Sequence, residues 1–229
     1  MKNIPKIKLA HLLTKPNEDR EKKSISQLQE LSKLSANLDY YQVINEPYVD
    51  EPPKHNVIFN RSDWVVGKTK PYCSFGLISG HYGCYLAHVN IIKKFFEDDN
   101  HDFLIIAECD CKIKVDYEYM ISKINFACEI LKKSNHKMFS FVHPTDQFVF
   151  CENIDEDIIL GHTIICTHLY MINKKDKDFY EKIFSSYGWH AWDWWINFVF
   201  EKENEKILCY KDANLTSQFE GASQIDRIE

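Results

Sequence analysis

The sequence predicts a single α/β domain in which a mostly parallel central sheet is flanked by helices. Residues 6–45 read as strand, helix and strand in succession, the order that is typical of parallel βαβ units. A second apolar run, residues 103–107, leads directly into two carboxylates, and a third, residues 163–172, is long and apolar enough for a core strand. With 229 residues, 45% of them hydrophobic and 14% aromatic, the chain can bury a substantial core.

In the first half, strands are predicted at residues 6–14 and 40–45, with a helix at 19–34 that places leucines at threes. Three prolines mark residues 46–56 as a loop, and residues 57–59 and 64–66 read as short strands. A helix then runs to residue 96 with Ser79 as its N-cap, and Gly80 and Gly83 allow another backbone or a ligand to come close. His81 and His88 share one face of this helix, where packing roles are weighed above ligand roles.

In the second half, helices are predicted at residues 116–133 and 176–187, and strands at 138–142, 163–172 and 206–210. Residues 148–151 and 158–160 are spaced as a small hairpin. A polar tail follows residue 210. No internal repeat and no linker divides the chain, so residues 1–229 are expected to form one domain. This domain could be part of a longer protein.

Composition excludes several classes of protein. The 28 basic and 34 acidic residues leave a net charge of −6, which argues against a general nucleic-acid binder. The polar N-terminus does not resemble a secretion signal, and no stretch approaches the roughly 18 apolar residues of a membrane span, so a cytoplasmic protein is expected. The eight cysteines include no C-x-x-C pair, which favours reduced thiols over disulfides and leaves Cys109 and Cys111 without a partner pair for zinc.

The pair Glu108 and Asp110 is the first candidate site. If the strand continued through them, both carboxylates would project to one side and Cys109 to the other. Two carboxylates in one buried place require that one is protonated or that a cation lies between them. A hard divalent ion with oxygen ligands and room for phosphates would suit them. The alternative, which the motif alone leaves open, is that both residues simply begin a solvated loop.

The second candidate is the segment of residues 189–195, which holds four tryptophans around Asp193. Aromatic faces bury a large area and also stack on sugars or bases. A carboxylate crowded by indoles is desolvated, which raises its pKa and suits a general base. The alternative is a core helix with Asp193 exposed on the opposite face.

Four pieces of the chain occur in a familiar order: Arg20 in the loop after the first strand, the run Gly83-Cys84-Tyr85-Leu86-Ala87-His88, the strand entering Glu108-Cys109-Asp110, and Gln218 followed by Ser223-x-Ile225. This order resembles the glycosyltransferases of the lipooligosaccharide-biosynthesis and collagen-galactosyltransferase type, family 25. That family has G-C-x-x-S-H and E-D-D in the corresponding places. Ala87 and Cys109 depart from the pattern, while both outer carboxylates of the acidic motif are kept.

The resemblance implies a GT-A (Rossmann-like) fold, a nucleotide-sugar donor, with a UDP-hexose as the expected form, and a divalent cation, Mn²⁺ or Mg²⁺. Transfer to a hydroxyl of a glycan or protein acceptor, with inversion, is the implied reaction. Residues 1–115 would bind the donor and residues 116–229 the acceptor. With the resemblance as a guide, the residues expected to bind the metal are Asp110 and Glu108, and those expected at the donor are Thr14, Arg20, His81, Gln218 and Ser223. Asp193 is the expected base, and Trp192, Trp194 and Trp195 form the expected acceptor platform.

Two further functions stay open on the same residues. The first is a nucleotide-sugar-binding or carbohydrate-binding module without turnover, which Cys109 in the acidic motif favours. The second is a metal-dependent phosphohydrolase, which would release phosphate from simple esters where a glycosyltransferase would not.

Overall fold

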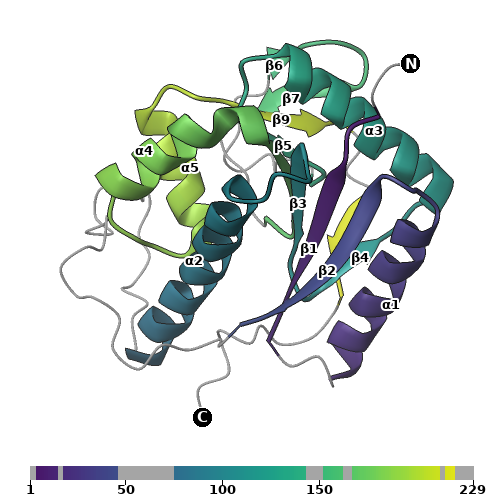
Figure 1. The fold of residues 1–229 in the computed structure, drawn as a ribbon. Coiled ribbons are helices and arrows are strands. Elements are labelled where there is room, and N and C mark those ends of the chain that lie inside the picture. Colours follow the sequence, from purple (N-terminus) through teal and green to yellow (C-terminus); the bar gives the residue numbers. More distant parts are fainter. Residues whose placement is uncertain are drawn as a thin grey trace.

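A mixed sheet divides the molecule into two helical layers (Figure 1). The structure is a computed structural model that describes residues 4–14, 18–45, 75–142, 152–161, 167–211 and 215–219. Across the sheet of eight strands found in these ranges, the order is β2 (Leu38–Ile44), β1 (Ile7–Leu13), β3 (Phe103–Ala107), β8 (Leu169–Asn173), β5 (Met138–Ser140), β9 (Ile207–Tyr210), β7 (Ile158–Gly161) and β6 (Glu152–Asn153).

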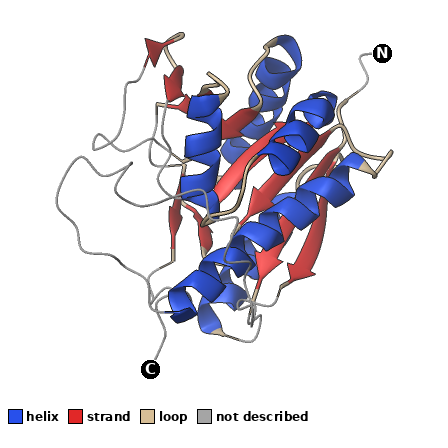
Figure 2. Ribbon diagram, turned by 90° about the vertical axis from the view of Figure 1, so that its left-hand side faces the viewer, coloured by secondary structure: helices blue, strands red, loops and turns tan. Residues whose placement is uncertain are grey.

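Helices cover both faces of this sheet, as the view in Figure 2 also shows. One face carries α2 (Phe75–Phe96), α4 (Lys177–Ser186) and α5 (Trp192–Lys202), and the other carries α1 (Asp19–Lys33) and α3 (Tyr117–Lys133). Strand side chains alternate between the two layers: Leu104 and Ile106 pack towards α2, whereas Phe103 and Ile105 pack towards α1 and α3. No helix in the described part of the chain has the length and apolar character needed to cross a bilayer.

The predicted α/β class, with a central sheet between helices, is confirmed, but the sheet is mixed rather than mostly parallel. Three pairings are parallel, namely β1–β2, β1–β3 and β5–β9. Four are antiparallel, namely β3–β8, β5–β8, β7–β9 and β6–β7. A strand buried on both faces is apolar along its length whichever way it runs, so the apolar run that becomes β8 carried no information on its direction.

Most predicted elements lie within a few residues of their expected bounds. Asp116, for example, caps α3 by accepting hydrogen bonds from the backbone N–H groups of Glu118 and Tyr119. The N-cap assigned to Ser79 was wrong, because α2 already begins at Phe75. The strands expected at residues 57–59, 64–66 and 148–151 lie outside the described residues.

A small second sheet was not predicted at all. The strands β4 (Cys111–Ile113) and β10 (Thr216–Gln218) pair antiparallel, with Gln218 opposite Cys111 and Thr216 opposite Ile113. The two strands are about a hundred residues apart in the chain, and neither has an apolar pattern long enough to stand out. This ladder brings the tail next to the acidic motif.

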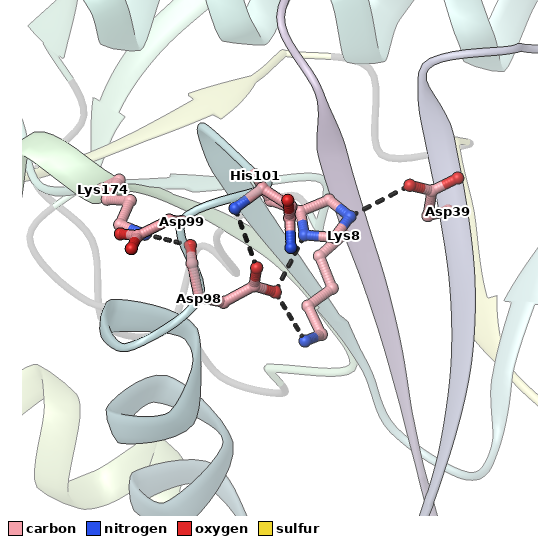
Figure 3. Close-up of polar contacts among 7 residues, drawn as sticks. Lys8, Asp39, Asp98, Asp99, His101 and Lys174 are labelled. Atoms are coloured by element: carbon pink, nitrogen blue, oxygen red, sulfur yellow. Dashed lines mark hydrogen bonds and ion pairs between the residues drawn. The ribbon is translucent and has the colours of Figure 1, made fainter.

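The amino ends of β1, β2 and β3 are joined by a polar network centred on Asp98 (Figure 3). The buried ring of His101 bridges two carboxylates, with Nδ1 at 2.8 Å from Asp98 Oδ2 and Nε2 at 3.0 Å from Asp39 Oδ2. Lys8 Nζ donates to the same oxygen of Asp98 at 2.9 Å. Burial acts against ionisation here, but the bonds from Lys8, Asn100 and His101 outweigh it and hold the pKa of Asp98 well below its usual range.

We expect Asp98→Asn to lower the free energy of unfolding by about 2 kcal/mol at neutral pH, because it removes a charged acceptor from Lys8 and His101. Since folding lowers the pKa of Asp98, its contribution is present above the unfolded pKa of about 4 and is lost as the pH falls below that value. Urea unfolding at several pH values measures both effects. The control is Asp99→Asn at an exposed neighbour; an equal loss in both variants would contradict the role of Asp98.

Candidate active site

The acidic motif forms a tight turn between β3 and β4, at the carboxyl end of β3. The N–H group of Cys111 donates to the carbonyl of Glu108 at 3.0 Å, so residues 108–110 leave the strand geometry. The expected alternation of side chains therefore does not apply: the guanidinium of Arg20 contacts both Cys109 Sγ, at 3.8 Å, and Asp110 Oδ2, at 3.9 Å. Neither carboxylate begins a solvated loop, because the side chains of Glu108 and Asp110 are only 23% and 16% exposed.

Glu108 is fixed by contacts from three residues, two just before β8 and one on α2. Its N–H group donates to the carbonyl of His168 at 3.0 Å, and Thr167 Oγ1 donates to its Oε1 at 2.8 Å. His88 Nε2 lies 3.5 Å from the same oxygen, and His88 Nδ1 lies 2.7 Å from the hydroxyl of Tyr170. Burial opposes ionisation of Glu108, but the contacts from His88 and Thr167 outweigh it, so its pKa lies below the usual value. Glu108 is therefore more readily ionised than an ordinary glutamate.

The two histidines beside Glu108 are neutral. Desolvation lowers the pKa of the buried His88, although Glu108 acts in the opposite direction. Desolvation likewise lowers the pKa of His168 to about 4. Neutral His88 can donate from Nε2 towards Glu108 while its Nδ1 accepts from the Tyr170 hydroxyl, so this ring links β8 to the acidic turn.

Asp110 differs from Glu108 in its surroundings. Its pKa is raised to about 6 by burial and, second, by the charge of Glu108, while Arg20 and a hydrogen bond from Gln218 oppose the rise. Its backbone carbonyl accepts from the N–H group of Phe219 at 2.7 Å. Its Oδ1 atom is buried and has no hydrogen-bond partner in the described structure. A buried acceptor without a partner is costly, so this oxygen suits a ligand that supplies a donor or a cation.

A buried carboxylate that the sequence did not single out joins α1 to Thr14, the residue after β1. Glu21 accepts from the Thr14 hydroxyl at 2.7 Å and from the Thr14 N–H group at 3.2 Å. This fixes Thr14 at the end of β1 and sets Arg20, one residue earlier on α1, against the acidic turn. Arg20 therefore lies beside Asp110, while a contact of Arg20 or Thr14 with a nucleotide stays a prediction.

A second missed group ties the same elements from below the turn. His11 Nε2 lies 3.0 Å from Ser24 Oγ, which donates to the carbonyl of Cys111 at 2.8 Å, and His11 Nδ1 lies 2.9 Å from the Tyr40 hydroxyl. This chain joins β1, α1, β2 and the residue after the acidic turn. The available signal was His11 itself, because a polar ring inside an apolar strand needs buried partners.

Asp193 stands in the first turn of α5 and is connected to Glu108 through two rings. His88 stacks on Trp192 with ring centroids 4.8 Å apart and planes 1° apart, and Trp192 precedes Asp193. The pKa of Asp193 is raised to about 6 by burial and, second, by the charge of Glu108. The N–H group of Trp194 donates to Asp193 Oδ1 at 2.9 Å and opposes the rise. Asp193 and Glu108 both raise the pKa of Cys84 on α2, after its burial. The two carboxylates therefore act on the same region.

The expected acceptor platform is reduced to one indole. Trp192 and Trp195 are fully buried in the layer of α2, α4 and α5, where they stack on each other at 5.3 Å, so neither offers a face to a glycan. Trp194 is 37% exposed and lies near His190, whose ring stacks on His81 at 5.9 Å. Through His190, the structure thus groups His81, which was expected at the donor, with Trp194, which was expected at the acceptor.

At the acidic turn, protein atoms supply only some of the ligands that a divalent cation needs. Among the described residues, no group of three or more His, Cys, Asp or Glu side chains is arranged to hold a metal ion. Glu108 and the unpartnered Oδ1 of Asp110 are hard oxygen ligands, and Mg²⁺ or Mn²⁺ commonly takes one or two carboxylates and completes its shell with phosphates and water. The residues fit such an ion as far as two ligands. Ser223, the remaining expected donor residue, lies outside the described residues.

Comparison with known proteins gives a likeness of fold alone. No protein-family model matches the chain, and no curated protein matches it, so the resemblance to family 25 stays a prediction. Among solved structures, a glycosyltransferase involved in the glycosylation of the major capsid of PBCV-1 is 12% identical with a TM-score of 0.44; the match covers 79% of this chain and 66% of that one, just under two thirds of its length.

Two other solved structures are similar over most of the chain. A protein from STIV is 8% identical with a TM-score of 0.45, and the match covers 94% of this chain and 86% of that one. The 4-diphosphocytidyl-2C-methyl-D-erythritol synthase from Anaerococcus prevotii DSM 20548 is 9% identical with a TM-score of 0.41, covering 94% and 93%. At these scores the likenesses carry no weight for the site, whose chemistry rests on its own residues.

The burial of the indoles can be tested by stability. We expect Trp192→Ala to lower the free energy of unfolding by about 3–5 kcal/mol, because it removes a buried ring that packs on His88 and Trp195. Trp194→Ala should cost less than about 1 kcal/mol, since that ring is partly exposed. Denaturant unfolding of the two variants side by side measures this; equal losses would show that the two rings are not placed as described.

Proposed function

We propose that this protein is a metal-dependent glycosyltransferase that moves a hexose from a nucleotide sugar to a hydroxyl of a glycan or protein. One observation carries the proposal. Asp110 Oδ1, a buried carboxylate oxygen with no partner among the described residues, lies in a turn whose other carboxylate, Glu108, is kept ionised. This is the environment that a cation bound to a diphosphate would complete. The order of motifs that resembles family 25 supports the same assignment from the sequence side.

Each described residue has a separate task in this proposal. Glu108 and Asp110 would hold Mn²⁺ or Mg²⁺, which when bound neutralises charge on the diphosphate leaving group. Arg20, held beside Asp110, adds a fixed positive charge close to the same place. Thr14 and Gln218, at the ends of β1 and β10, flank the donor. Cys109 is given no catalytic task in this proposal, because burial raises the pKa of its thiol well above the usual range and keeps it uncharged.

Asp193 serves as the general base in an inverting transfer. The acceptor O–H bond breaks as its proton passes to the Asp193 carboxylate, and the acceptor oxygen forms a bond to C1 of the sugar. The bond between C1 and the phosphate oxygen breaks, and the nucleoside diphosphate leaves with that electron pair. A carboxyl group whose pKa is about 6 is ionised at neutral pH and still accepts a proton more readily than an ordinary aspartate. Trp194, next in the chain and partly exposed, supplies an aromatic face for the acceptor sugar.

Metal-dependent donor binding tests the proposal directly. With Mn²⁺ present, the wild-type chain should bind at least one of UDP-glucose, UDP-galactose, UDP-N-acetylglucosamine and GDP-mannose in calorimetric titrations, and EDTA should abolish binding. Asp110→Ala should weaken binding by more than about 100-fold, because it removes a direct ligand. Asp99→Ala at the opposite end of the sheet is the matched control. Binding that ignores both EDTA and Asp110→Ala, with no turnover, would instead favour the binding module.

The base assignment predicts a pH profile. Transfer measured as kcat/KM should rise about tenfold per pH unit on the acid side and level off above about pH 6, because Asp193 must lose its proton to act. The charged or hydrogen-bonding groups that act on Asp193 are Glu108 from the end of β3 and the N–H group of Trp194. Asp193→Asn, which keeps the acceptor for that N–H group, should lower kcat by about 100-fold or more without changing donor affinity.

Asp178→Asn provides the control for Asp193, since Asp178 is also an acidic residue in the first turn of a helix but is exposed. It should leave kcat unchanged. A profile that is flat between pH 5 and 7, or full activity in Asp193→Asn, would remove Asp193 from the mechanism.

A further inference from the structure

His168 lies directly beside the acidic turn, at the start of β8. Its carbonyl accepts from the N–H group of Glu108, and the hydroxyl of its neighbour Thr167 donates to the Glu108 carboxylate. The side chain of His168 is buried, with 4% of the residue exposed. The sequence did not single out this residue, because it falls within an apolar stretch read only as a core strand.

A chain of hydrogen bonds fixes which ring nitrogen of His168 carries the proton. Thr216 Oγ1 donates to the carbonyl of Phe141 at 3.0 Å, so the same oxygen is left to accept from His168 Nε2, at 3.1 Å. The neutral ring therefore has its proton on Nε2 and presents a lone pair at Nδ1.

This lone pair is unused within the described structure: Nδ1 is buried and has no hydrogen-bond partner there. It shares that condition with Asp110 Oδ1. A buried acceptor that stays unpaired is costly, and each such group in a folded protein calls for an explanation. Both atoms need a partner that donates a hydrogen bond or carries positive charge.

The short strand β10 contacts both residues that carry the unpaired acceptors. Thr216 and Gln218 are two residues apart on this strand, so their side chains project from the same face, roughly 7 Å apart. Thr216 bonds to the ring of His168, and Gln218 bonds to the carboxylate of Asp110.

We propose that His168 Nδ1 accepts a hydrogen bond from a hydroxyl group of the sugar being transferred, while Asp110 serves the diphosphate next to it. The inference rests on the proposed glycosyltransferase function and adds a residue that selects the donor sugar. A fixed acceptor recognises a sugar with a hydroxyl at the matching position and orientation and rejects a sugar that lacks it, because the buried nitrogen would again be left unpaired. The nucleoside diphosphate alone makes no use of His168.

Calorimetric titration of the wild-type chain and His168→Gln, with Mn²⁺ present, tests this contact. A glutamine amide reaches the position of Nε2 and can still donate to Thr216, but it offers no acceptor at the position of Nδ1. The probes are UDP and GDP and their glucose, galactose, N-acetylglucosamine and mannose derivatives. We expect His168→Gln to bind the preferred nucleotide sugar about tenfold more weakly and to bind the matching nucleoside diphosphate within about twofold of wild type.

Two further measurements keep the result clear if His168→Gln folds poorly. His168→Asn, whose side-chain oxygen reaches the position of Nδ1, should recover part of the sugar affinity although it loses the bond to Thr216. Deoxyfluoro donors, in which fluorine replaces one hydroxyl at a time, need no substitution in the protein. One such donor should bind wild type about tenfold more weakly than its parent, and the same replacement should make no difference in His168→Gln.

The outcomes separate this inference from the proposed function. If the wild-type chain binds no nucleotide and no nucleotide sugar, the glycosyltransferase function fails and this inference fails with it. If donors bind in a metal-dependent way but His168→Gln and every deoxyfluoro donor behave like their parents, only the role of His168 is overturned. An equal loss for the nucleoside diphosphate and for its sugar also overturns it, since His168 would then contact the nucleotide.

Discussion

A single ionised carboxylate, Glu108, sets the conditions for every other group at this end of the sheet. Its backbone joins β3 to the residue before β8 and closes the turn into β4, and its side chain is held by Thr167 and His88. Because these contacts keep Glu108 charged in a place shielded from water, its field raises the pKa of Asp110 and Asp193 after their own burial. Glu108 thus has a lowered pKa, whereas Asp110 and Asp193 have raised pKa values. Carboxyl groups whose pKa values are shifted in opposite directions are typical of sites that both bind a ligand and transfer a proton.

The two ends of the sheet use similar residue types for different purposes. At the amino ends of the strands, Asp98 has a basic group or an N–H donor for each of its oxygens, and the network is saturated. At the carboxyl end of β3, Asp110 and His168 each keep a buried acceptor that no described residue satisfies. Saturated polar clusters stabilise a fold, whereas unsaturated ones lower its stability until a ligand supplies the missing partners. This contrast, rather than the number of carboxylates, separates a structural cluster from a candidate site.

Local patterns predicted most of the fold because they depend on neighbours in the chain. The helical stripe of α1, the cap at Asp116 and the apolar runs of β1, β3 and β9 are of this kind. Strand direction was not predictable from a strand buried on both faces, and β4 and β10 were too short to recognise. In the site, Glu108, Asp110, Arg20 and Asp193 were singled out from residue type and order. The structure places Arg20 beside Asp110, and the roles of all four residues stay predictions. His168, Glu21 and His11 were missed, because their importance comes from partners distant in sequence. The burial of Trp192 and Trp195 agrees with the alternative of a core helix rather than with the acceptor platform.

The pairing of β10 with β4 separates the part of the chain that builds the scaffold from the part that completes the site. The described strands of the large sheet come from residues 7–210, and β10 pairs with none of them. Thr216 fixes the tautomer of His168, and Gln218 and Phe219 bond to Asp110. Loss of β10 would therefore spare the pairings of the large sheet and remove contacts that position the ligand-binding end.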